Sequence, residues 1–152
     1  MRDAPIFRLE KFLPFRVNRV ADNLVREIGG VYREMYGMSR GEWRVLAHLG
    51  ANGSNTASNL MALTALDKVK ISRAVTALGA RGWLSRDVDR ADRRVYHLSL
   101  TEAGRAAFAR LAPAMQARQQ DLFEGLDAER YARIEAALQD LEAVLHIEMP
   151  ER

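Results

Sequence analysis

Three short helical segments in succession constrain the fold of this chain more than any other feature. Their N-caps are expected at Ser39, at Ser54 or Thr56, and at Asp67. Glu42 follows Ser39 by three residues, which is the spacing of a capping box. The third segment covers residues 68–81, and Gly82 is placed to end it. The sequence therefore predicts three short helices in series in the middle of the chain.

Two segments typical of β-strands follow the third helix, and the second of them alternates between its two faces. They are residues 83–88 and residues 94–100. The polar residues 89–93 between them predict a hairpin turn. Short helices followed by a basic helix and a hairpin are typical of a helix-turn-helix with an appended wing. We therefore expect a mainly α fold with a small β-hairpin wing, an α+β winged helix-turn-helix.

Longer helices are expected on both sides of this central region. Apolar residues at steps of three and four predict a helix over residues 13–36. Thr101 and Asp127 have the position of N-caps for two further helices. Pro113 lies inside the first of these two and is expected to kink it. Long terminal helices thus enclose the short central ones.

The terminal segments contain more apolar residues than a small domain needs to cover itself. The first segment adds Phe7, Leu9, Phe12, Leu13 and Phe15 to its helical stripe. A monomer of 152 residues would leave such a surplus as an exposed patch, so a partner surface, a second copy of the chain, is predicted. Gly29 and Gly30, within the first helix, indicate either a bend or the close approach of another backbone.

Positive charge is concentrated in one part of the chain. The net charge of the whole sequence is +3, but residues 68–105 hold nine Lys and Arg against four Asp and Glu, which leaves the remainder at −2. A local excess of this kind suits a polyanion, because each neutralised phosphate releases condensed counterions. A solvated helix face is the alternative interpretation.

The helix expected over residues 68–81 has one face suited to DNA. Its buried stripe is Ile71, Val75 and Leu78. At 100° per residue, the opposite face contains Val69, Arg73, Thr76 and Ala80. Small residues there let a helix approach the major groove, and Arg73 can bond to guanine N7 and O6 while Val69 meets a thymine methyl. The predicted contacts of this helix are Lys68, Val69, Lys70, Ser72, Arg73 and Thr76; an ordinary basic surface helix is the alternative.

The turn of the hairpin is predicted to bind the minor groove. Its residues alternate in sign, and a carboxylate can hold a neighbouring guanidinium extended, which reduces the entropy lost on entering a narrow groove. Asp92 is expected to position an arginine, and either Arg93 or Arg94 to be the inserted side chain. Arg90 completes the predicted contacts of the wing.

Short motifs follow one another along the central and later parts of the chain. They are residues 67–73 (DKVKISR), Leu78, residues 82–86 (GWLSR), Asp89, residues 92–94 (DRR) and residues 98–105 (LSLTEAGR). Together they resemble the winged-helix core of MarR-type transcriptional regulators. The resemblance covers nearly the whole chain, because the long helices lie where that family places its dimerisation region. It implies an obligate homodimer that binds double-stranded DNA at a pseudo-palindromic operator, usually as a repressor.

On this resemblance the chain divides into three parts. Residues 1–36 would form an N-terminal dimerisation helix, residues 37–102 the winged helix-turn-helix DNA-binding domain, and residues 103–152 the C-terminal dimerisation helices. No repeat or flexible linker separates them, so we expect one continuous body.

The resemblance also implies an effector site between the dimerisation helices and the winged helix. Members of the family often release DNA when a small anionic aromatic compound binds. Arg16, near the start of the first helix, is expected to anchor the carboxylate of such a compound, with Phe12, Trp43 and Met115 as apolar walls. The alternative is an exposed Arg16 and a Trp43 that belongs to the ordinary core.

Composition excludes several other functions. The chain has no cysteine, which excludes disulfides, thiolate metal sites and the reactive-cysteine sensing of peroxides found in some branches of the family. The three histidines are scattered, so we expect no metal or cofactor. No apolar run approaches the ~18 residues of a membrane span, and we expect a cytoplasmic protein without a membrane partner.

Two other classes of function are weighed against DNA binding. An enzyme would need a nucleophile with a base; Ser72, His97 and Asp92 are present, but Ser72 lies in no Gly-x-Ser-x-Gly turn and the chain has no Gly-rich phosphate loop. We therefore expect no enzyme. The alternative that stays open is a ligand-independent architectural or protein-binding winged helix, whose terminal helices bind a different protein.

Overall fold

The helices begin where the expected caps place them. The computed structural model describes residues 7–89 and 92–147, and its helices are η1 (Leu9–Lys11), α1 (Leu13–Tyr36), α2 (Arg40–Asn52), α3 (Ala57–Thr64), α4 (Lys68–Ala80), α5 (Glu102–Phe123) and α6 (Ala128–Val144). The cap side chains of α2 to α6 each accept a hydrogen bond from the backbone N–H three residues later; they are Ser39, Thr56, Asp67, Thr101 and Asp127. The predicted N-termini are thus confirmed, with Thr56 as the cap of α3.

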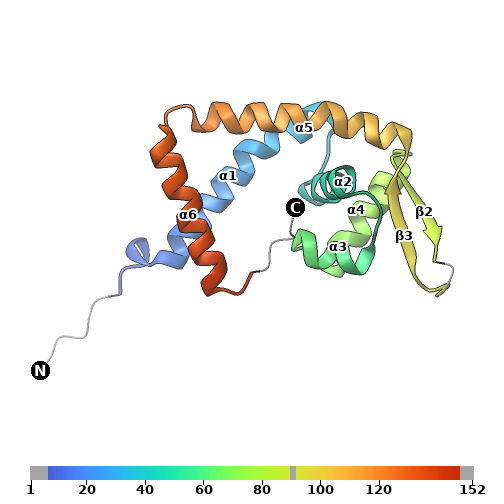
Figure 1. The fold of residues 1–152 in the computed structure, drawn as a ribbon, viewed down its shortest axis with the longest axis horizontal. Helices are drawn as coiled ribbons and strands as arrows, with labels where there is room; N and C mark the ends of the chain where they lie inside the picture. Colours follow the sequence, from blue (N-terminus) through green and yellow to red (C-terminus); the bar gives the residue numbers. More distant parts are fainter. Residues whose placement is uncertain (1–6, 90–91, 148–152) are drawn as a thin grey trace, which may run out of the picture.

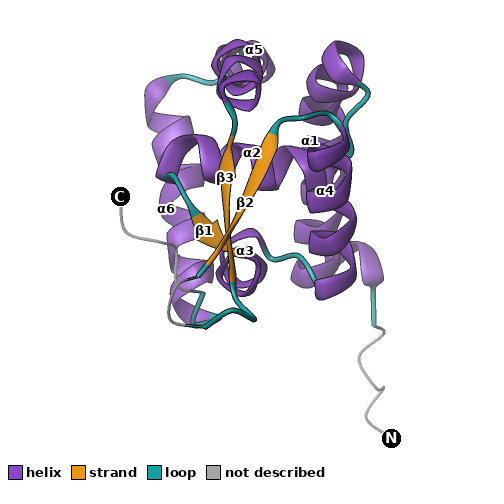
Figure 2. Ribbon diagram, turned by 90° about the vertical axis from the view of Figure 1, so that its right-hand side faces the viewer, coloured by secondary structure: helices purple, strands orange, loops and turns teal. Residues whose placement is uncertain are grey.

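The strands form an antiparallel sheet of three, in the order β1-β3-β2, with β1 (Asn55–Thr56), β2 (Leu84–Val88) and β3 (Tyr96–Leu100). The predicted hairpin is β2 and β3, each slightly shorter than expected. Trp83 is excluded from β2 because its N–H caps α4 by bonding to the Leu78 carbonyl, 3.0 Å away. Strand β1 was not predicted, because two residues are too few to show alternation. Figure 2 looks onto the three strands, which lie below α5.

The core lies where α2, α3, α4 and the first half of α5 meet the sheet. Its fully buried leucines include one from each of these helices: Leu46, Leu60, Leu78 and Leu111. Each such side chain contributes about 1.5–3 kcal/mol by leaving water. The predicted stripe of α4 is buried, so the rotational setting of this helix is confirmed.

Three glycines of the helices have different roles. Helix α2 was expected to end within residues 50–53; its last residue is Asn52, and Gly53 caps it with a φ of +80°, which suits glycine. Gly50 instead lies inside the helix, where an added Cβ would overlap the ring of Phe108 from α5. At Gly29 the space is filled by the side chains of Tyr32 and Arg33 of the same helix, with Tyr32 Oη 2.6 Å from the Cβ position, and not by another backbone.

The terminal helices extend away from this core (Figure 1). Helix α5 crosses the top of the molecule and continues through Pro113 without interruption. Helix α6 turns down from its far end, and none of its described residues is buried. The first half of α1 is equally exposed, whereas Tyr32, near its other end, is buried in the core. None of the helices among the described residues is apolar and long enough to span a membrane.

Candidate nucleic-acid interface

Helix α4 presents the predicted face to solvent. Each of the six residues predicted to contact DNA on this helix is exposed, as is Ala80. Ile71, Ala74 and Val75 are buried on the opposite side and fix the helix against the core. The exposed face therefore combines small side chains with Arg73 and is open to a large partner.

The N-terminus of α4 is held by its cap. Asp67 Oδ1 accepts a hydrogen bond from the Lys70 backbone N–H at 2.8 Å, and Asp67 Oδ2 lies 2.9 Å from the Lys70 ammonium. The bond from the Lys70 side chain, aided by that from its backbone, holds the pKa of the Asp67 carboxyl below its usual range. This pairing orients Lys70 beside the first turn, where the helix dipole also favours an anion.

A groove runs between α4 and the wing. Its lining includes buried apolar side chains, such as Ile71 and Val75, and exposed cations from both elements: Lys68 of α4, Arg86 of β2 and Arg94 at the hairpin turn. Ser72 of α4 and Tyr96 of β3 lie along the same groove. The helix face and the wing thus border one concave surface, and an anionic polymer could contact both at once.

The hairpin turn is organised by two aspartates. Asp92 binds Arg94 through three hydrogen bonds, from the backbone N–H at 3.0 Å, from Nε at 3.1 Å and from Nη2 at 3.2 Å. The bond from the Arg94 side chain is the largest cause of the lowered pKa of the Asp92 carboxyl. The Arg94 side chain is 90% exposed, and Asp92 holds its guanidinium through Nε and Nη2, so the direction of this group in solvent is defined.

The sequence left open which wing arginine is positioned, and the geometry assigns that place to Arg94. Arg93 is also exposed, and Arg90 lies outside the described residues. The Arg94 N–H bonds to Asp92 Oδ1, and the Val95 N–H bonds to the Asp92 carbonyl at 2.9 Å. Both residues therefore belong to the turn, and β3 begins at Tyr96 and not at the predicted Arg94.

Sequence reasoning missed two residues that hold the hairpin turn to β3, Asp89 and His97. Asp89 Oδ1 accepts the backbone N–H of Asp92 at 2.9 Å, and Asp89 Oδ2 lies 2.8 Å from His97 Nε2 on β3. Arg86, on the groove, was missed as well. The hairpin predicted from the sequence could have indicated this contact: the two strands face each other, and in the structure Asp87 lies opposite His97, with Asp89 two residues further on.

The four residues predicted as one effector site divide between two places. Trp43 and Met115 line a cavity between α1, α2 and α5, together with Tyr32, Arg40 and Arg44. Arg16 lines other hollows near the start of α1, and the ring of Phe12 packs against Phe7 with centroids 5.4 Å apart. Arg16 does not reach the cavity that Trp43 lines because α1 is long: sixteen residues of helix separate Arg16 from Tyr32, a distance of about 24 Å.

The cavity beside Trp43 combines stacked rings with two guanidinium groups. The rings of Tyr32 and Trp43 are stacked with centroids 6.3 Å apart. Arg44 Nη1 donates to the Thr64 carbonyl at 2.8 Å. Burial, followed by repulsion from Arg40, lowers the pKa of Arg44. Two like charges beside an apolar wall would favour an aromatic anion, which offsets their repulsion.

Comparisons with known proteins agree with this geometry. A sequence model of the MarR family matches residues 36–95, while no curated protein is a significant match to the chain. A MarR-family transcriptional regulator from Silicibacter pomeroyi is 30% identical, with 99% of this chain and 100% of that chain covered and a TM-score of 0.71.

Two more distant structures share the fold. One is a mutant of MarR from E. coli complexed with operator DNA, with 20% identity, coverage of 91% of this chain and 99% of that chain, and a TM-score of 0.79. The other is BpsR from Bordetella bronchiseptica, whose DNA binding is regulated by 6-hydroxynicotinic acid; it has 22% identity, coverage of 90% and 96%, and a TM-score of 0.80. With the winged-helix fold and a full-length relative at 30% identity, the chain belongs to the MarR family of transcriptional regulators.

Proposed function

We propose that the chain is a homodimer that binds a pseudo-palindromic operator in double-stranded DNA, represses transcription, and releases the DNA when a small aromatic acid binds. The observation that carries the proposal is the shared groove, in which Lys68 of α4 and Arg86 and Arg94 of the wing border the exposed face of α4. A basic helix and a wing on one surface have the docking geometry of winged-helix proteins. The E. coli relative of the same fold, which is complexed with operator DNA, supports this proposal.

Each element has its own role in this proposal. Helix α4 is the recognition helix in the major groove, where Arg73 bonds to a guanine and Val69 and Thr76 make close contacts with bases. Lys68, Lys70 and Ser72 bind phosphates around it. Arg94, oriented by Asp92, enters the minor groove with Arg93 beside it, and Arg90 stays a predicted contact of the wing.

The dimer is proposed from the terminal helices. The start of α1 and much of α6 expose apolar side chains; those at least 38% exposed include Leu13, Val17, Val20, Ile134 and Leu138. A second copy that covers these faces would place two recognition helices on half-sites about one helical turn, ~34 Å, apart. Residues 1–36 and 103–152 would then supply dimerisation, and residues 37–102 the binding of DNA.

The effector is proposed to bind in the cavity beside Trp43. Its rings and its two arginines, Arg40 and Arg44, suit an aromatic carboxylate. The site lies between α1 of the dimerisation region and α2 of the winged helix, so a ligand there can change how the two are joined. Regulation of BpsR by 6-hydroxynicotinic acid, an aromatic acid, supports an effector of this class.

The test of DNA binding compares two arginines on an operator selected from random DNA. Arg73→Ala should weaken binding to that operator by about 1–3 kcal/mol and relax the preference at one position of each half-site, with little loss on random DNA. Arg94→Ala should weaken binding to both and reduce the slope of log K against log salt by about one. Gel shifts at several salt concentrations measure both effects.

The matched control is Arg110→Ala, which removes an exposed arginine of α5 far along the chain from the groove. It should leave both affinities unchanged. Equal losses on operator and random DNA for Arg73→Ala would show that this side chain only contacts phosphate. Absence of any sequence-selective binding by the unmodified chain would contradict the proposed function itself.

A further inference from the structure

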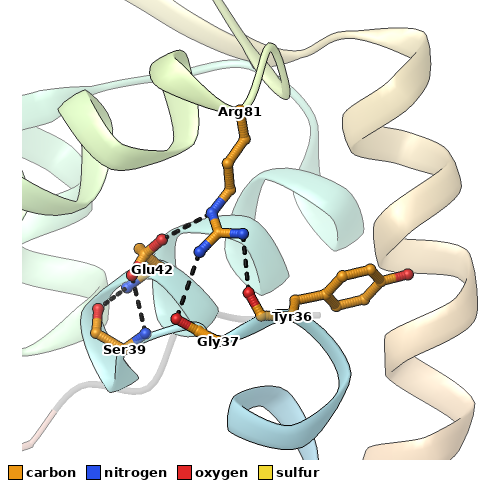
Figure 3. Close-up of polar contacts among 5 residues, drawn as sticks. All are labelled: Tyr36, Gly37, Ser39, Glu42 and Arg81. Atoms are coloured by element: carbon orange, nitrogen blue, oxygen red, sulfur yellow. Dashed lines mark hydrogen bonds and ion pairs between the residues drawn. The ribbon is translucent and has the colours of Figure 1, made fainter.

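Arg81 joins the end of the recognition helix to the junction between α1 and α2 (Figure 3). It is the residue after α4, and its backbone N–H bonds to the carbonyl oxygens of Ala77 and Gly79 within that helix. Its side chain points away from α4 and toward the junction (Figure 3). Arg81 is thus attached to α4 through its backbone and to the junction through its guanidinium.

The first attachment is to the end of α1. Arg81 Nη1 donates to the carbonyl oxygen of Tyr36 at 2.8 Å, and Nη2 donates to that of Gly37 at 3.4 Å. Carbonyl groups at a helix C-terminus lack donors within the helix and carry its partial negative charge. The guanidinium therefore satisfies and neutralises the end of the helix that we assign to the dimer interface.

The second attachment is to the start of α2. Arg81 Nε donates to Glu42 Oε1 at 3.1 Å, while Glu42 Oε2 accepts the backbone N–H of Ser39 at 2.8 Å. Glu42 is only 6% exposed. One buried carboxylate thus closes the capping box of α2 and binds the cation at the end of α4. Because a buried charge that loses its partner is strongly destabilising, this pair resists separation of α2 from α4.

Aromatic rings pack around the same guanidinium. Its central carbon lies 5.3 Å from the ring centroid of Trp83, and the ring of Tyr36 meets that of Trp83 edge to face with centroids 5.0 Å apart. The Trp83 carbonyl accepts the backbone N–H of Thr101 at 3.0 Å, which connects the cluster to the start of α5. The end of α1, the start of α2 and the end of α4 therefore meet in one cluster around Arg81.

We propose that Arg81 is a positioning residue that sets the angle between α1 and the recognition helix α4, and thereby the separation of the two recognition helices in the dimer. The inference rests on the proposed function, in which α1 contributes to the dimer interface and α4 enters the major groove. Arginine suits the task because its rigid planar fork donates in several directions at once. A lysine ammonium could pair with Glu42 but could not also bridge the two carbonyl groups in the same geometry.

The first experiment measures the placement of α4 relative to α1 in the absence of DNA. The chain has no cysteine, so a spin label can be attached to cysteines placed at two exposed positions, Asp22→Cys on α1 and Ser72→Cys on α4. Dilution with unlabelled protein restricts the measured distances to those within one chain. Arg81→Lys should broaden the distance distribution roughly twofold, because a hinge between packed elements is released. Arg110→Lys, the matched control, should leave it unchanged, and an unchanged distribution in Arg81→Lys overturns the proposal.

The second experiment measures how DNA affinity depends on the separation of the two half-sites. Operators are built with the half-site separation of the selected operator and with separations changed by one or two base pairs. The unmodified chain should lose about tenfold or more in affinity on the altered operators, because two half-sites must match two fixed helices. Arg81→Lys should lose no more than about threefold on the same change. A spacing profile identical to that of the unmodified chain would overturn the proposal.

The two experiments separate failure of the inference from failure of the proposed function. If the unmodified chain shows no sequence-specific binding, the proposed function fails, while the label distances still decide the role of Arg81. If Arg81→Lys does not fold, as judged by its melting curve, Glu42→Gln takes its place. That variant retains an oxygen for the Ser39 N–H but removes the charge that faces Arg81, and the same broadening is expected.

Discussion

The winged-helix region and the terminal helices carry the same kind of apolar stripe but bury it to different degrees. Leu78 of α4 is 0% exposed, whereas Leu138 and Leu145, in and just after α6, are 51% and 64% exposed. The central helices are short and turn sharply at their caps, so they meet around one core. Helix α1 alone extends about 36 Å, which carries its first half beyond that core. Helical periodicity therefore predicts that an apolar face is buried, but not whether the surface that covers it belongs to the same chain.

The two regions also differ in how they use charge. In the winged-helix region, carboxylates hold cations in place: Asp92 holds Arg94, Asp67 holds Lys70, and Glu42 holds Arg81. Between the terminal helices, an ion pair joins Glu27 of α1 to Arg118 of α5 at 2.9 Å. Exposed pairs of this kind contribute little stability by themselves. Their effect in the winged helix is to orient positive groups: Arg94 at the groove, Lys70 beside the first turn of α4, and Arg81 at the junction between α1 and α2.

The largest expected effect is in the core of the winged helix. Leu78→Ala should lower the free energy of unfolding by about 2–5 kcal/mol, because it leaves a cavity among fully buried side chains. Denaturant unfolding measures it, and the loss should be the same over a wide range of protein concentration. A loss that depends on protein concentration would contradict the contrast between the two regions, because it would make the central core part of the subunit interface.

A smaller and different effect is expected in α6. Leu138→Ala should destabilise the dimer by about 1.5–3 kcal/mol in total, because each of the two copies loses only part of the burial of one leucine. This loss weakens association roughly ten- to hundredfold. Sedimentation at several concentrations measures this change, and the unfolding of the separated chain should hardly alter. Glu135→Gln, on an exposed position of the same helix, is the control. A monomeric mass for the unmodified chain at micromolar concentration would contradict the dimer.

The smallest effect is expected at the cavity between the two regions. An aromatic acid that binds tenfold better to the released state shifts the equilibrium by only ~1.4 kcal/mol. Arg40→Ala should abolish the release of operator DNA by such an acid while leaving DNA affinity within a few-fold. Gel shifts with a panel of aromatic acids measure the response.

Arg16→Ala is the informative comparison for that measurement. It should leave the effector response intact, because Arg16 does not line the cavity beside Trp43. If Arg16→Ala loses the response and Arg40→Ala keeps it, the carboxylate of the effector is anchored in the first turns of α1 and not in the cavity beside Trp43. No response to any acid of the panel would favour the ligand-independent winged helix.

Most of the fold could be predicted from local patterns. Capping residues predicted the starts of α2 to α6, and alternation predicted the hairpin, because these signals depend on backbone groups within a few residues. Strand β1 and the edges of β2 and β3 could not be predicted, since they depend on hydrogen bonds from β3, α4 and the Asp92 side chain. The predicted face of α4 followed from the same periodicity that defines its buried side.

The sequence by itself determined the capped helices, the exposed basic face of α4 and the arginine-rich turn, because each depends on residues close together in the chain. Only the tertiary structure decided that Arg94 is the arginine bound by Asp92, that Trp43 and Met115 share a cavity with Arg40 and not with Arg16, and that Arg81 reaches Glu42 and the end of α1. Glu42 and Arg81 are 39 residues apart. Contacts between such distant residues arise only when helices have packed, and packing depends on the whole core.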